Sequence, residues 1–137
     1  MILGAGRFAF AQDTLIVTTQ LGSYKIENRN LERLKLGYVI KSSKDVPEAL
    51  KYFRRARWLQ AGGMLFGVPG GFILGYQIGY YVSTQKLLEK EVLLTGLGLY
   101  TVSHTFSLLR NRAIKKGAIA YNQFRAEQRK NYDNQTP

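Results

Sequence analysis

The sequence predicts an all-α membrane protein built around an antiparallel hairpin of two transmembrane helices. Two uncharged segments, 58–85 and 92–109, are long enough to cross a bilayer, which takes about 20 predominantly apolar residues. Basic residues crowd against the outer ends of both segments, as they do in membrane proteins. The intervening STQKLLEKE is short, so the two helices are expected to run antiparallel.

Residues 1–12 form a signal-like segment. The stretch AFAQD, 9–13, has small residues at the two positions that signal peptidase reads, with cleavage after Ala11. Arg7 interrupts the apolar run before it, and that run is short. Two interpretations stay open: the true start lies upstream, or the segment is not a signal.

Residues 13–57 are expected to form an N-terminal extramembrane region. The β-branched run TLIVTT, 14–19, predicts a short strand, and 23–30 predicts a second strand or an irregular turn. The spacing of apolar residues predicts a short helix from Leu31 to near Lys41. Ser43 is the predicted N-cap of a longer helix that continues into the first membrane span.

The first span is predicted at about 59–82. Trp58 and Tyr80 lie 22 residues apart, which corresponds to ~33 Å of helix and approximates the hydrocarbon thickness of a bilayer. Aromatic and basic residues favour the two membrane interfaces. The set expected to meet lipid headgroups comprises Arg54, Arg55, Arg57, Trp58, Tyr80, Tyr81, Arg110 and Arg112.

A soluble protein with two buried helices is the alternative interpretation. In water, a glycine costs a helix about 1 kcal/mol and a proline about 3 kcal/mol. The stretch 62–81 holds seven glycines besides Pro69, so such a helix would be unstable in water. In lipid the helix persists, because an open backbone is penalised more heavily there.

Five glycines of the first span recur at every fourth position: Gly63, Gly67, Gly71, Gly75 and Gly79. This spacing predicts a face without side chains that lets another helix approach closely. The face winds around the helix by about 40° per step and favours a right-handed crossing.

The glycine run resembles the glycine zippers of small bacterial envelope proteins of the two-transmembrane type. The resemblance implies close helix packing and oligomerisation, and no chemistry. The AFAQD junction, the two basic-flanked spans and the stretch AIAYN, 118–122, also resemble uncharacterised envelope proteins of the Bacteroidota.

The second span, at about 92–109, offers small polar residues to that glycine face. Thr95, Ser103 and Ser107 share one helical face, and Ser103 or Thr95 is expected to hydrogen-bond across the interface for ~0.6 kcal/mol each. The same span contains His104, the chain's single histidine. Two interpretations apply to it: a neutral imidazole bonded to the partner helix, or a proton relay.

Residues 110–137 are predicted to form a basic C-terminal helix and tail. The two clues to membrane topology conflict. A cleaved signal at Ala11 would place both chain ends outside the cytoplasm, whereas the basic flanks favour cytoplasmic ends. The expected localisation is a bacterial membrane, with the inner membrane favoured; an outer-membrane or periplasm-facing complex is the alternative.

The composition argues against catalysis. The chain has no cysteine and one histidine, and it shows no metal-ligand spacing, no nucleotide-binding motif and no nucleophile beside a base. We therefore expect no catalytic, cofactor-binding or metal site, and no enzyme.

The predicted function is that of a structural or accessory subunit of an envelope complex. Its expected partners are membrane lipids and other membrane subunits or further copies of itself, with no nucleic acid. An oligomeric pore or transporter-like element is the first alternative, from the zipper together with Gln77 and His104. A polyanion-binding protein is the second, from the net charge of +11.

Overall fold

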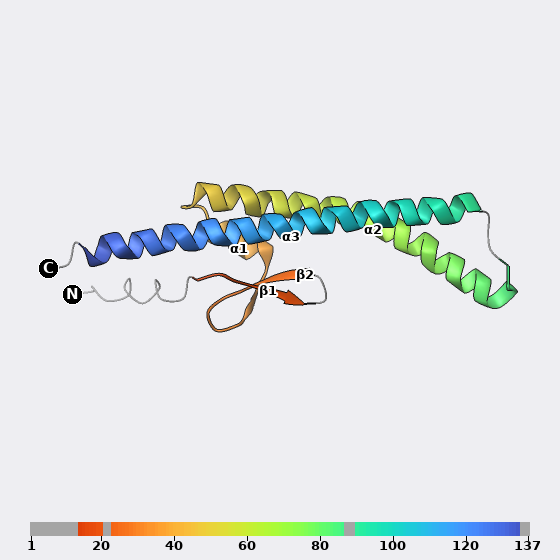
Figure 1. Cartoon of the computed structure of the whole chain (residues 1–137), viewed down its shortest axis with the longest axis horizontal. Helices are drawn as coiled ribbons and strands as arrows, with labels where there is room; N and C mark the ends of the chain where they lie inside the picture. Colours follow the sequence, from red (N-terminus) through yellow and green to blue (C-terminus); the bar gives the residue numbers. More distant parts are fainter. Residues whose placement is uncertain (1–13, 21–22, 87–89, 135–137) are drawn as a thin grey trace. The chain divides into compact units, whose positions relative to one another are not determined.

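A computed structural model describes residues 14–20, 23–86 and 90–134. The fold is mostly helical, as expected (Figure 1). Its elements are β1 Ile16–Gln20, β2 Ser23–Glu27, β3 Arg33–Leu34, α1 Leu36–Ser42, α2 Pro47–Thr84 and α3 Lys90–Asp133. The signal-like segment 1–12 lies outside the described residues.

The chain divides into two compact units. One comprises residues 1–56 and 111–137 and is called the base unit here; the other comprises residues 57–110 and is called the hairpin unit. Both long helices pass through both units. The continuous helix expected to run from the basic cluster through residues 59–82 is confirmed as α2, and α3 runs from the second predicted span into the basic C-terminal segment.

The base unit contains a three-stranded antiparallel sheet in the order β1-β2-β3. Val17 pairs with Ile26, and Ile26 pairs with Leu34 on its other side. The strands predicted within 14–19 and 23–30 are therefore present. The third strand was not predicted, because its two residues are too few to show an alternation.

The short helix begins later than predicted. Leu31 is not helical but lies in a turn with a φ of 61°, and α1 starts at Leu36. The Asn28 side-chain oxygen accepts the main-chain N–H groups of Asn30 and Glu32 and holds this turn. Arg33 and Leu34 then pair with β2 as strand β3, so the helix begins only after them.

Ser43 is not the N-cap of the long helix. Its hydroxyl donates a 2.7 Å hydrogen bond to the main-chain oxygen of Val39, and its buried side chain closes the end of α1. The long helix α2 begins instead at Pro47, where the missing N–H of proline leaves no helical bond unmade.

The core of the base unit forms where α2 and α3 lie against each other. Phe53 of α2 and Ile114 and Tyr121 of α3 are among its largest fully buried side chains. A Cβ added to Gly117 would lie 2.8 Å from the ring of Phe53, so glycine permits the close approach of the two helices there. Arg125 forms a 2.9 Å ion pair with Asp45 across the same unit.

Two asparagines of α3 bind the β-strand region. Asn122 accepts a 2.9 Å hydrogen bond from the Leu15 N–H and donates one of 2.7 Å to the Leu15 main-chain oxygen. Asn111 accepts the Tyr24 N–H at 3.3 Å. The sheet is thus attached to the helix by backbone recognition as well as by apolar packing.

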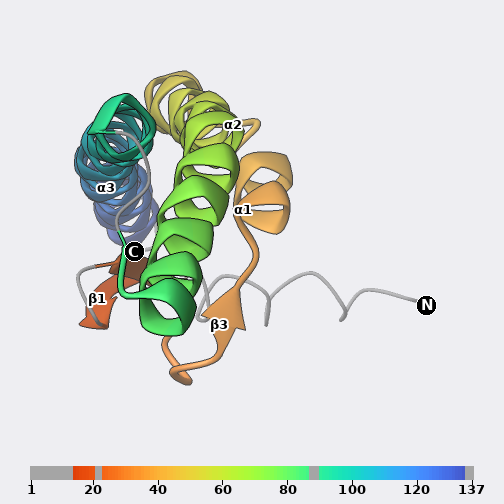
Figure 2. The ribbon, with the colours of Figure 1, turned by 90° about the vertical axis from the view of Figure 1, so that its right-hand side faces the viewer.

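In the hairpin unit, α2 and α3 are antiparallel neighbours that contact each other (Figures 1 and 2). The helix α2 is continuous through Pro69. Helical bonds on either side of the proline therefore hold, although its own N–H is missing.

Candidate functional site

The two units distribute their apolar side chains in opposite ways. All the buried apolar residues among those described lie in the base unit. Sixteen of the twenty large apolar side chains that are exposed lie in the hairpin unit, including Trp58 at 79% and Phe72 at 75%. A water-soluble domain places such side chains in its core, and contiguous exposed apolar surface marks an interaction site for membrane or protein.

The helix α3 is long and apolar enough to cross a membrane, and it alone meets that criterion among the described helices. Only 6% of its most apolar stretch is buried, whereas a core helix of a soluble protein would be mostly covered. The first predicted span, within α2, does not reach the same mean hydropathy. Its glycines, Pro69 and Gln77 lower the average.

Glycines of α2 provide the closest approach between the helices of the hairpin unit. A Cβ added to Gly62 would lie 2.8 Å from the Phe106 ring, and one added to Gly67 would lie 2.5 Å from the Ser103 hydroxyl. At Gly70 the added atom would meet the backbone of α3 itself, at 3.0 Å from the Tyr100 nitrogen. Real Cβ atoms essentially never lie within 3.0 Å of another heavy atom, so a side chain at Gly62 or Gly67 would displace Phe106 or Ser103, and one at Gly70 would press against the backbone of α3.

A glycine of α3 completes the contact. A Cβ added to Gly96 would lie 2.8 Å from Ile73 and 3.1 Å from Leu74. Along α2 the contacting positions Gly63 and Gly70 are seven residues apart, as are Gly96 and Ser103 along α3. Seven-residue spacing is typical of helices that stay in register with a partner over several turns.

The predicted five-glycine face therefore divides into two parts. Gly63 and Gly67 lie against α3, whereas no atom of the described ranges lies within 4 Å of a Cβ added to Gly71, Gly75 or Gly79. The cause is the four-residue period, which rotates about 40° per step on a helix of 3.6 residues per turn. After Gly67 the stripe has turned away from α3.

The predicted polar residues of α3 differ in their roles. Ser103 donates a 2.8 Å hydrogen bond to the main-chain oxygen of Gly63, which is the expected bond between the helices. Thr95 instead donates to the main-chain oxygen of Glu91 on its own helix, at 2.8 Å. Ser107 is exposed and lines a cavity.

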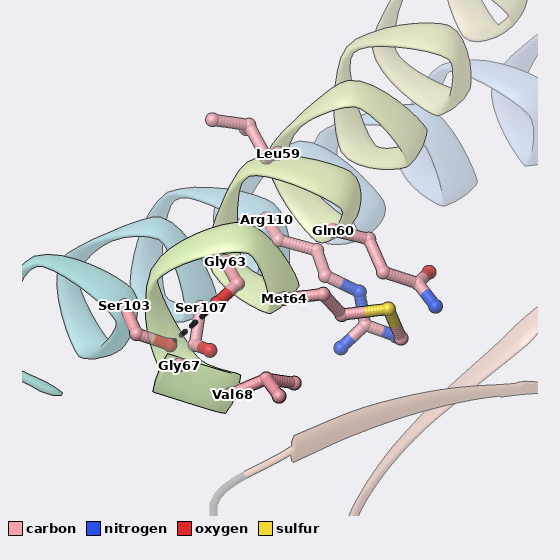
Figure 3. A pocket seen from close by; sticks show the side chains of 9 residues that line it. All are labelled: Leu59, Gln60, Gly63, Met64, Gly67, Val68, Ser103, Ser107 and Arg110. Atoms are coloured by element: carbon pink, nitrogen blue, oxygen red, sulfur yellow. Dashed lines mark hydrogen bonds between the residues drawn. The ribbon is translucent and has the colours of Figure 1, made fainter. Parts of the chain in front are cut away.

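That cavity, of about 330 Å³, lies between α2 and α3 within the hairpin unit. Figure 3 shows the side chains of Gln60, Met64 and Arg110 extending to the same side of α2. Glycine backbone, two serines and apolar side chains complete the lining: Leu59, Gly63, Gly67, Val68, Ser103 and Ser107. The cavity therefore combines a guanidinium and hydroxyl groups with an apolar wall.

The residues predicted to meet lipid headgroups occupy both units. Arg54, Arg55 and Arg112 are exposed in the base unit. In the hairpin unit, Arg57 and Trp58 are exposed at one end of the predicted first span, and Arg110 is half-buried beside the cavity. Tyr81 is exposed at the other end of the span, and Tyr80 stacks on Tyr76 there with a centroid distance of 6.4 Å.

Two polar residues of the spans have contrasting surroundings. Gln77 is 3% exposed, and neither its side-chain nitrogen nor its oxygen has a hydrogen-bond partner among the described residues. His104 is exposed on α3, so its imidazole faces away from the contact between the two helices. Across the described ranges, no three His, Asp or Glu side chains gather into a potential metal site.

Sequence reasoning did not select Gly70, Gly96 or Phe106, which carry close contacts between α2 and α3 besides that of Gly67 with Ser103. A search for seven-residue spacing would have found them, since Gly63, Gly70 and Gln77 share it on α2 and Leu99 and Phe106 share it on α3. No protein-family model, no curated protein and no solved structure matches this chain.

Proposed function

We propose that the chain is a non-catalytic structural or accessory subunit of a bacterial membrane complex. Its hairpin unit crosses the membrane as two antiparallel helices, and it associates with other membrane subunits or further copies through the outward glycines of α2. The inner membrane is the favoured location. The single observation that carries the proposal is the outward orientation of apolar side chains and of three glycines on one helix.

The membrane part of the proposal is supported by the apolar surface that the hairpin unit exposes. Side chains such as Leu65, Phe72 and Ile78 are exposed along α2. The hydrophobic effect stabilises burial of each such side chain by about 1.5–3 kcal/mol relative to exposure in water. Lipid acyl chains around α2 and α3 would cover these side chains. The free-energy cost of exposing them to water would then disappear, while the packing between the two helices would stay the same.

The association part is supported by the glycines that the hairpin does not use. Gly71, Gly75 and Gly79 form two consecutive GxxxG steps with open space beside each of them. Such steps let a second helix approach the backbone closely in lipid. Exposed Phe72 and Tyr76 alternate with these glycines and would supply apolar contacts next to the groove.

Substitution of the outward glycines tests the association. The variant Gly71→Leu/Gly75→Leu should leave the monomer folded, because no described residue lies within 4 Å of a Cβ added at either position, and should abolish its assemblies in mild detergent. Gly98→Leu is the matched control, since that exposed glycine of α3 also has nothing within 4 Å. The measurement is mass by light scattering; equal assembly of both variants with the wild type contradicts the proposal.

Membrane insertion is tested separately. The wild-type chain should float with lipid vesicles in a density gradient and should remain with them after extraction at alkaline pH, which removes proteins held at the surface by charge. A chain that is released by that treatment, or that stays monodisperse in buffer without detergent, is not inserted.

A further inference from the structure

We propose that the cavity beside Arg110 binds one anionic phospholipid, with the lipid phosphate at Arg110 and an acyl chain along the apolar wall. This inference rests on the proposed membrane function of the hairpin unit. It goes beyond general attraction of the basic flanks to a membrane surface, because it assigns a selective site to named residues.

The polar end of the cavity suits a phosphate. Arg110 supplies a guanidinium, whose planar fork of N–H groups binds phosphate oxygens in pairs. Ser107 lies one helical turn before it on α3, and the Gln60 amide comes from α2 (Figure 3). These three side chains all line the same cavity, so one phosphate group can receive hydrogen bonds from both helices.

The apolar end suits an acyl chain rather than a free anion. Met64 and Val68 line the cavity from α2 and are both exposed. Between them and α3, Gly63 and Gly67 contribute backbone without side chains, which leaves room for a chain to lie along the groove. A soluble phosphate would make no use of this wall.

The charge of the chain around this end favours a negative partner. Along the sequence, residues 51–57 and 110–116 hold eight bases and no acid. No Asp or Glu occurs between Glu48 and Glu89, or between Glu91 and Glu127. Basic residues at the ends of membrane helices are the usual recognition element for anionic lipid headgroups, and the cavity places one of them beside an apolar groove.

The test is native mass spectrometry of the full chain in detergent, with phosphatidylglycerol or phosphatidylcholine of the same acyl chains added. The wild type is expected to retain one phosphatidylglycerol per chain in preference to phosphatidylcholine. Arg110→Gln should weaken retention about tenfold, since a hydrogen bond to a charged group contributes that much. Lys115→Gln is the matched control, because it removes one positive charge from an exposed residue of α3 that lies outside the cavity and outside the predicted lipid-headgroup set.

A second pair of variants tests the cavity without changing charge. Ser107→Leu fills the space next to Arg110 and should weaken retention, whereas Thr105→Leu adds the same side chain at an exposed position outside the cavity and should not. This pair keeps the inference testable if Arg110→Gln fails to fold.

Three results would overturn the inference. These are equal retention of the two lipids, equal retention by Arg110→Gln and Lys115→Gln, or displacement of the lipid by millimolar inorganic phosphate, which would show that the apolar wall contributes nothing. Each leaves the chain floating with vesicles. Failure of the membrane function itself would instead appear as loss of flotation whatever the lipid composition, so the two failures are distinguishable.

Discussion

The Ser103 hydroxyl on α3 donates a 2.8 Å hydrogen bond to the main-chain oxygen of Gly63 on α2. The acceptor lies inside a continuous helix, where its oxygen also accepts the helical bond from four residues later. The absence of a Gly63 side chain exposes that oxygen to the neighbouring helix. The bond therefore exists because glycine and serine face each other at closest approach.

Ser103→Ala should lower the free energy of unfolding of the hairpin by only about 0.6 kcal/mol, because the Gly63 oxygen keeps its helical bond. The control is Thr105→Ala, whose hydroxyl donates to Thr101 on its own helix. Unfolding would be driven by sodium dodecyl sulfate and followed by energy transfer between dyes on cysteines introduced at exposed positions 61 and 108. The chain has no native cysteine, so labelling is specific.

A loss above about 2 kcal/mol for Ser103→Ala would contradict this account, since transmembrane hydrogen bonds measured by double-mutant cycles stay below that value. An equally large loss of stability for Thr105→Ala would show that these hydroxyls act through hydrogen bonds within α3 instead.

Gly96→Leu should separate the two helices, because its Cβ would already lie 2.8 Å from Ile73. Overpacking of this kind costs about 1–3 kcal/mol, and more where backbone cannot move. Gly98→Leu on the same helix meets nothing within 4 Å and should leave the energy transfer unchanged. Equal effects of the two substitutions would mean that helix propensity, rather than contact with α2, determines the result.

The sequence predicts the helices better than their contacts. The continuous helix from the basic cluster into the first span follows from the long uncharged run, and the β-branched residues of TLIVTT predict β1. The onset of α1 could not be predicted from apolar spacing, because Arg33 and Leu34 pair with β2 as strand β3 after a turn held by the Asn28 side chain.

The residues through which α2 contacts α3 are also predicted only in part. The four-residue glycine repeat is unbroken and is therefore the most prominent pattern in the span. Because each step rotates around the helix, the repeat leaves the interface with α3 after Gly67. Which glycines of α2 contact α3 also depends on the residues of α3 opposite them. Gly96 is one such residue, but its contact with α2 can be known only when the register between the two helices is known. Seven-residue spacing within each helix can indicate the residues of the contact face, but it cannot report the register between the two helices.

Gln77→Leu should stabilise the hairpin. The wild-type amide is 3% exposed, and neither of its polar atoms has a partner among the described residues. Burial of an unsatisfied amide costs about 1–3 kcal/mol in proteins, and leucine fills a similar volume without that cost. The measurement is the same detergent unfolding by energy transfer.

A decrease in stability for Gln77→Leu would show that the amide bonds to a group from outside the chain, such as another subunit. Repeating the measurement at a tenfold lower protein concentration separates the cases, because a bond to a second subunit weakens on dilution while a property of the monomer does not.

Asn122→Ala should release the start of the strand region from α3. Asn122 accepts one hydrogen bond from Leu15 and donates another to it, and Leu15 is buried. Loss of both leaves two backbone groups unsatisfied in a partly buried setting, at about 1–3 kcal/mol. Hydrogen exchange at the Leu15 amide should therefore accelerate by at least about fivefold, since each 1.4 kcal/mol corresponds to a factor of ten. Gln123→Ala, at the exposed neighbouring position, is the control and should leave the exchange unchanged. Unaltered exchange in Asn122→Ala would mean that apolar packing of Leu15 alone holds the strand region against α3, and that the two hydrogen bonds contribute nothing to its attachment.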